Sequence, residues 1–152
     1  MFRLDWFGLS EGAAADHRGM LTLVGFNPQV LAIPLEAMPA SVGLVLVVVL
    51  ESDDPERPGD HALGYSVRLT APDGSILFAA QQTAPLPVRI HPELPIRVQI
   101  VLGTQVALRL HGRYEAAVTI EFPDQAPIYG TRSIYVMSPV ELGPEATTSA
   151  PP

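Results

Sequence analysis

One stretch of this chain constrains its fold more than any other, the run ASVGLVLVVVLE from Ala40 to Glu51. No charge interrupts the chain between Glu36 and Glu51, so these side chains need cover from water. A membrane helix needs about 20 consecutive apolar residues, and the apolar part, Val42 to Leu50, is far shorter and rich in β-branched valine. The run therefore predicts a β-strand that is covered on both faces.

The two faces of this strand carry different side chains because residues alternate along a strand. We expect one face to carry Leu44, Leu46, Val48 and Leu50, and the other to carry Val45, Val47 and Val49. One face fits the core of a β-sandwich. The other must meet a loop, a terminal segment or another protein.

The rest of the chain also shows strand periodicity rather than helical periodicity. From Leu63 to Thr70 apolar and polar residues alternate, and the same period recurs in the segments 96–102, 114–120 and 134–136. GMLTLVGF and QVLAI predict two shorter strands, and sixteen prolines and twelve glycines punctuate the sequence. We expect an all-β sandwich of about eight or nine strands, with long loops at ESDDPERPGDH and TAPLPVRIHPELP.

Four residues are assigned structural roles in turns. Pro72 and Gly74 flank Asp73 in a sequence typical of a hairpin turn, which predicts an antiparallel return of the following strand. Gly112 and Tyr114 lie in a Leu-x-Gly-x-Tyr pattern. This spacing is typical of a tyrosine corner, in which the phenol bonds to upstream backbone and locks a Greek-key crossover.

Composition excludes several kinds of chemistry. The chain has no cysteine, and its nine basic residues are all arginine. Thiolate catalysis, Cys-ligated metals and disulfides are therefore excluded, as are lysine Schiff bases and a P-loop lysine. The formal charge of -7 argues against nucleic acid and anionic membranes as partners.

Length and the terminal segments indicate the domain organisation. The 152 residues fit one domain, which we place at residues 1–142 with a flexible tail at 143–152. The first residues lack the apolar core of a signal peptide, so we expect a cytoplasmic protein. The chain has no lysine and a single asparagine, Asn27, which indicates a GC-rich, bacterial genome.

Two groups of residues are candidate chemical sites. The acidic loop 51–60 contains Asp53, Asp54 and Asp60, whose carboxylates are the type of ligand that Ca²⁺ prefers, although their spacing matches no known calcium loop. A solvated loop is the simpler interpretation. The histidines are scattered over separate turns, and no motif of a nucleophile, a zinc site or a phosphate loop accompanies them: His17, His61, His91 and His111. We therefore expect no cofactor and no enzymatic activity.

The N-terminal segment is the most aromatic part of the chain, with Phe2, Trp6 and Phe7. Either these rings dock onto the sandwich as part of a strand, or they anchor a partner, because exposed aromatics concentrate binding energy. Only 16% of residues are charged, against about 25% in an average soluble domain. Either many strands are buried on both faces, or another protein chain covers some apolar surface.

Several of these segments together resemble an uncharacterised family of bacterial, mainly actinobacterial, domains. The resemblance is carried by ADHRGMLTLVGF, the apolar strand, the Pro-Asp-Gly hairpin and HGRYEAAVTIE, and covers about residues 13 to 137. His111-Gly112 replaces the Pro-Gly that is usual in the family. The resemblance implies an immunoglobulin-like antiparallel β-sandwich with Greek-key topology, and it implies no activity or catalytic residues.

The sequence thus predicts a non-enzymatic protein-interaction or assembly module, with a protein partner or self-association through a sheet edge or the N-terminal aromatic segment. The alternative is a ligand- or cation-binding sandwich that uses the acidic loop 51–60.

Overall fold

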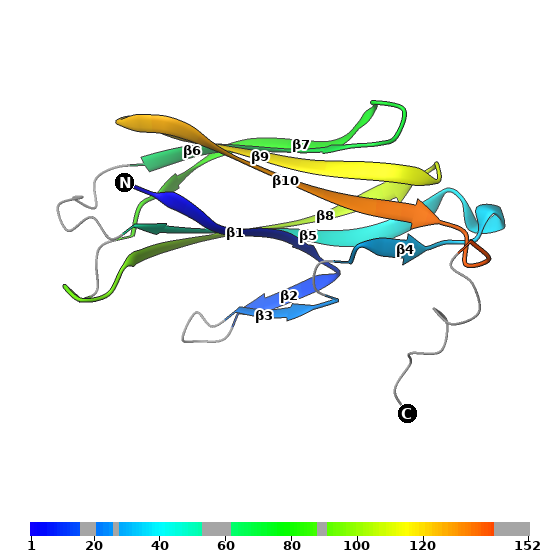
Figure 1. Cartoon of the computed structure of the whole chain (residues 1–152), viewed down its shortest axis with the longest axis horizontal. Helices are drawn as coiled ribbons and strands as arrows, with labels where there is room; N and C mark the ends of the chain where they lie inside the picture. The colour runs from blue at the N-terminus through cyan, green and yellow to red at the C-terminus, as the bar shows by residue number, and fades with distance from the viewer. Residues whose placement is uncertain (16–20, 26–27, 53–61, 88–90, 142–152) are drawn as a thin grey trace.

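The computed structural model describes residues 1–15, 21–25, 28–52, 62–87 and 91–141. These residues form two facing β-sheets and one small hairpin (Figure 1). One helical turn, η1 (Leu35–Ala37), is present in the described ranges.

The first sheet has three strands in the order β1-β5-β8. These strands span Arg3–Ser10, Ala40–Ser52 and Ile96–Leu108. Both pairings are antiparallel, and β5 lies in the middle with all thirteen of its residues paired to β8. The apolar run therefore forms the central strand of this sheet.

The second sheet has five strands in the order β4-β10-β9-β6-β7. In chain order, these strands span Val30–Ala32, Ala62–Thr70, Ile76–Pro85, Gly112–Phe122 and Gln125–Met137. In the lettering of immunoglobulin domains the three-stranded sheet corresponds to A-B-E, and β10, β9, β6 and β7 correspond to G, F, C and C′. The all-β, immunoglobulin-like sandwich predicted from sequence is confirmed.

The structure corrects several details of that prediction. β10 and β4 pair in parallel, so the sandwich is not wholly antiparallel. Ten strands are described rather than eight or nine, because β2 (Gly12–Ala15) pairs with β3 (Leu21–Val24) in a separate hairpin. The sequence of β2, GAAA, has low β propensity, so only its partner reveals it as a strand. β7 extends to Pro85, into a segment expected to be loop, because its last residues pair with β6.

The core lies between the two sheets and takes one face of each long strand. In β6 the buried side chains are Leu63, Tyr65, Val67 and Leu69, as alternation predicts. In β9 they are Tyr114, Ala116, Val118, Ile120 and Phe122. Side chains of β1 and β5 close the core from the other sheet.

The predicted turn residues meet in space. Gly74 has φ +85° and closes the turn between β6 and β7, where its N–H donates to the carbonyl of Ala71 at 2.9 Å. Gly112 has φ +131°, and a Cβ there would lie 3.0 Å from Cγ of Pro72. Tyr114 Oη donates to the Leu110 carbonyl at 2.8 Å and accepts from the Leu110 N–H at 3.2 Å, which confirms the tyrosine corner.

β1 joins the two sheets along one side of the sandwich. The Phe2 N–H donates to Gln125 Oε1 at 2.9 Å, and Gln125 Nε2 donates back to the Phe2 carbonyl at 3.1 Å. The rings of Phe2 and Phe122 stack with centroids 5.0 Å apart. A Cβ on Gly130 would lie 3.0 Å from Leu4 Cδ2, so this glycine allows β10 to approach β1 closely.

Candidate interaction surface

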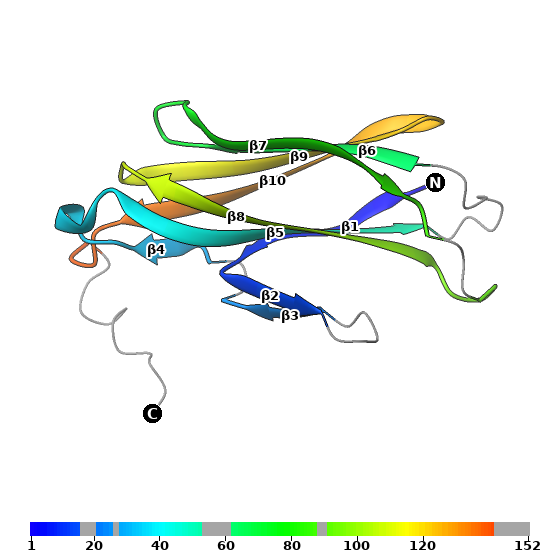
Figure 2. The same cartoon turned by 180° about the vertical axis from the view of Figure 1, so that it is seen from behind.

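The second face of the apolar strand lies on the outside of the sandwich. The β2–β3 hairpin lies on this side of the three-stranded sheet, away from the five-stranded sheet, in both views (Figures 1 and 2). Val47 is fully buried, whereas Val45 and Val49 are half-buried. The chain thus covers much of this face itself, and the apolar run alone no longer argues for a partner.

A row of apolar groups crosses this outer face. Trp6 pairs with Val49, and Val47 pairs with Val101 of β8. Val101 is 43% exposed, which makes it the open end of the row. A shallow hollow of about 330 Å³ lies along the row and is lined by Asp5, Trp6, Leu23, Val47, Val49, Arg97 and Gln99. Its walls suit an apolar side chain better than a charged ligand.

A charged ladder borders this hollow. Glu51 bridges Arg3 and Arg97 across the three strands, with Nη2 to carboxylate oxygen distances of 2.9 Å and 3.1 Å. A hydrogen bond from Arg3, and a smaller contribution from the hydrogen bond of Arg97, hold the pKa of Glu51 below its ordinary value. Glu51 is the first carboxylate of the acidic loop, and its engagement with two arginines disfavours it as a cation ligand.

The edges of the two sheets differ in how they are protected. β1 has a register irregularity between Leu4 and Trp6, and its backbone accepts a hydrogen bond from Arg132 Nε at the Phe7 carbonyl, 2.8 Å away. β4 has three residues and is followed by Pro34. β7 has a register irregularity at its start and ends at Pro85. Bulges, short length and proline are the devices by which proteins block edge pairing.

β8 carries none of these devices. It is thirteen residues long, contains no proline, pairs with β5 without a register shift and has no second partner among the described strands. Its outward side chains are Arg97, Gln99, Val101, Gly103, Gln105 and Ala107. Only one of these is charged. Figure 2 shows β8 and β7 as the outermost strands of their sheets on the same side of the sandwich.

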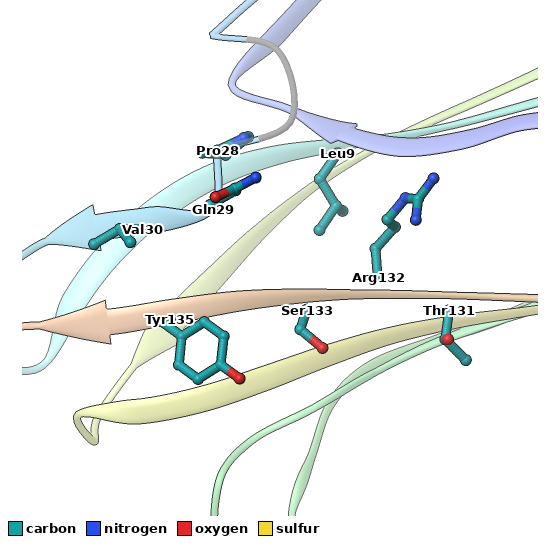
Figure 3. A pocket seen from close by; sticks show the side chains of 8 residues that line it. All are labelled: Leu9, Pro28, Gln29, Val30, Thr131, Arg132, Ser133 and Tyr135. Atoms are coloured by element: carbon teal, nitrogen blue, oxygen red, sulfur yellow. The ribbon is translucent and has the colours of Figure 1, made fainter.

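A groove on the opposite side lies between β1, β4 and β10 (Figure 3). It has a volume of about 470 Å³ and is lined by Leu9, Pro28, Gln29, Val30, Thr131, Arg132, Ser133 and Tyr135. Arg132 is the only charged residue among the described residues of the lining, and its Nε already donates to the backbone of β1. Arg132 and the hydroxyl groups have no carboxylate or histidine beside them in this lining, so the groove offers no acid–base pair.

The structure separates the three aromatic residues proposed as anchors. Phe2 and Phe7 are 3% and 2% exposed in the core. Of the two interpretations of the aromatic segment, docking onto the sandwich therefore holds for these two rings, and they are not exposed candidates for partner contact. The bulge in β1 turns Phe7 inward while Trp6 faces out beside Val49. Phe2 precedes the bulge, and its ring stacks on Phe122. Only Trp6, which is half-buried, remains accessible to a partner.

Of the acidic-loop and histidine candidates, only His91 and His111 lie in the part of the chain that the structure describes. Asp53, Asp54, Asp60, His17 and His61 lie outside the described residues, as does the segment 142–152 that includes the predicted tail. His111 Nε2 lies 2.9 Å from the Ile33 carbonyl, and His91 Nδ1 accepts from the Glu93 N–H at 3.2 Å. Within the described ranges, no three His, Asp or Glu side chains group as metal ligands.

The sequence analysis predicted a sheet edge as the interaction surface but did not identify β8 as an edge strand. The six outward positions of β8 carry only one charge. Alternation alone cannot show that this strand ends a sheet.

The described part of the chain has no helix of the length and apolarity that a membrane crossing requires. No protein-family model matches the sequence, and no curated protein matches it either.

Solved structures show distant similarity. One is β-glucuronidase 2 of Bacteroides uniformis bound covalently to cyclophellitol-6-carboxylate aziridine, with TM-score 0.49 and 13% identity. That match covers 64% of this chain and 12% of the glucuronidase. Another is the C-terminal domain of wzt, with TM-score 0.47, 8% identity and coverage of 90% of this chain and 74% of that domain.

A third similar structure is the CARDB domain of the PF1109 protein from Pyrococcus furiosus, solved in complex with di-metal ions. The match has TM-score 0.43 and 12% identity, and covers 89% of this chain and 94% of that domain. At such low identity these similarities concern the fold alone.

Proposed function

We propose that this chain is a non-enzymatic protein-interaction module that binds partners by strand addition to β8. One observation carries the proposal, namely the thirteen-residue free edge of this strand, with which no second strand pairs among the described residues. The backbone N–H and C=O groups of an edge strand offer a template for another strand. In strand addition these groups supply affinity, and neighbouring side-chain pockets supply specificity.

The outer face beside this edge supplies such side-chain contacts. Val101 projects from β8 itself, and the hollow beside Trp6 lies on the same face of the sheet. A strand added to β8 would place alternate side chains over this face. The low proportion of charged residues in the chain also supports a surface that is covered by protein.

The resemblance to an uncharacterised bacterial family and a place in the bacterial cytoplasm remain part of this proposal. Cation binding by the loop 51–60 is the alternative, and it rests on residues outside the described ranges. A calcium titration followed by melting temperature tests it, because a ligand that binds only the native state raises stability.

Site-specific photocrosslinking in cells that express the protein naturally tests the interaction. A photoreactive amino acid replaces Val101 at the β8 edge, and the control replaces Tyr129, which is 68% exposed on β10. We expect a discrete crosslinked protein product from position 101 and none from position 129. Equal yields at both positions, or no product at position 101, would contradict strand addition at β8.

A further inference from the structure

We propose that the strand added to β8 is β8 of a second copy of this chain, in an antiparallel pairing that forms a two-fold symmetric dimer. This inference rests on the proposed function and names its partner. The two three-stranded sheets would join into one sheet of order β1-β5-β8-β8-β5-β1. A two-fold interface must be self-complementary, because the same surface of both copies is in contact: if one residue contacts a second residue of the other copy, the reverse contact also forms.

The two-fold axis can pass through the central residue of β8, Leu102. In this register all thirteen residues of the strand lie opposite a residue of the second copy. Because paired residues point to the same face in an antiparallel ladder, the outer face of one copy continues into the outer face of the other. The row of apolar side chains that ends at Val101 in the monomer then continues onto the second copy.

Side-chain sizes fit this register on the outer face. Val101 lies opposite Gly103 of the second copy, and nothing lies within 4 Å of the position that a Cβ on Gly103 would take. The exposed valine therefore has open space to enter. Gln99 lies opposite Gln105, and two amides can exchange hydrogen bonds.

Charge also fits this register. The whole chain has a formal charge of -7, which opposes self-association in general. Along β8, however, the single outward charge is Arg97, which lies opposite Ala107 in this register. No like charges face each other directly across the axis. The half-buried Leu102 meets its own copy on the inner side.

Sedimentation equilibrium of the purified chain, paired with two double variants, tests the dimer. Gln99→Lys with Gln105→Lys places like charges opposite each other twice across the axis, and both glutamines are exposed in the monomer. We expect the dimer dissociation constant to rise at least about tenfold, because like charges in direct cross-strand pairs are destabilising. Gln99→Lys with Gln105→Glu is the matched control, and we expect it to dimerise as well as the original chain. Circular dichroism should show the same fold in all three proteins.

Disulfide trapping tests the register, and the absence of native cysteine makes the result clean. Val101→Cys with Gly103→Cys brings two cysteines opposite each other, at a Cα separation of about 4.5–5.5 Å that a disulfide can span. We expect oxidation to give a covalent dimer. The control, Thr119→Cys with Glu121→Cys, has the same spacing on the outer face of β9 and should stay monomeric.

A monomer at every concentration, with no covalent dimer from the 101/103 variant, would overturn the second copy as partner. The crosslinking experiment would then test the proposed function independently of the dimer. A crosslink from position 101 to a different protein in cells would support strand addition at β8 with another partner. The absence of any crosslinked product would contradict both strand addition and the dimer.

Discussion

At the scale of single residues, two polar side chains connect separate segments of the structure. Tyr114 ties the start of β9 to the turn before it, and Glu51 ties three strands together at the rim of the outer face. Both act through hydrogen bonds that the surrounding chain partly shields from water. Substitutions that remove these hydrogen bonds should therefore change stability in ways that can be measured.

Tyr114→Phe removes both hydrogen bonds to the Leu110 backbone while keeping the buried ring. We expect a loss of about 1–3 kcal/mol in the free energy of unfolding, because part-buried backbone groups lose their partner. Urea denaturation measures this loss. Tyr129→Phe, at an exposed position, should change stability by less than about 0.5 kcal/mol. Equal losses of unfolding free energy for the two substitutions would contradict a stabilising role of the tyrosine corner.

Glu51→Gln should alter the dependence of stability on pH. The pKa of Glu51 is lowered in the fold, so its ionised form stabilises the protein above the unfolded-state pKa, and this contribution is lost as pH falls through the folded-state pKa. We expect the original chain to melt at a higher temperature than the variant at pH 7. The gap should narrow as pH falls below the ordinary value of 4.5. A gap that stays constant down to pH 3, roughly one unit below an ordinary glutamate pKa, would contradict this role.

At the scale of elements, β5 shows how one apolar strand serves two different surfaces. Leu46 is 1% exposed and points into the core, while Val49 is half-buried on the outer face beside Trp6. Leu44, Val48 and Leu50 share the side of Leu46, as expected from alternation. The outer side is covered by a tryptophan and a hairpin rather than by a second sheet.

Leu46→Ala should therefore cost far more than Val49→Ala. For Leu46 we expect a loss of about 2–5 kcal/mol, because a core cavity remains. For Val49, whose side chain is only half-buried on the outer face, we expect a loss of about 1 kcal/mol or less. Chemical denaturation of both variants measures the difference. Similar losses would mean that the outer face packs as tightly as the core.

At the scale of the whole molecule, β1 is the strand that closes the sandwich. It carries Phe2, Phe7 and Leu9 into the core and is bonded to β10 through Gln125 and Arg132. Removal of residues 1–10 would expose the core along β5 and β10. The chain should then need this segment in order to fold.

We expect the chain lacking residues 1–10 to lose cooperative thermal unfolding and near-ultraviolet circular dichroism. Both signals report fixed side-chain packing. Asp5→Ala, which changes an exposed residue of the same strand, should keep both. A truncated chain that unfolds cooperatively at the original midpoint would contradict the closing role of β1.

The sequence by itself determined the local features of this protein. It determined that Leu44, Leu46, Val48 and Leu50 share a face, that Pro72 and Gly74 form a turn, and that Tyr114 forms a corner. These features depend on alternation and on backbone preferences, which act over a few neighbouring residues. The all-β class followed from the same patterns.

Only the tertiary structure decided which strands are neighbours and which edges stay open. The burial of Phe7, the outward orientation of the half-buried Trp6 and the parallel pairing of β4 all depend on contacts between residues far apart in the chain. The same holds for β8, whose alternation matches that of β9 although β8 lies at an edge and β9 lies in the middle of a sheet. Periodicity records which face of a strand is buried, whereas the position of a strand in its sheet is set by long-range pairing.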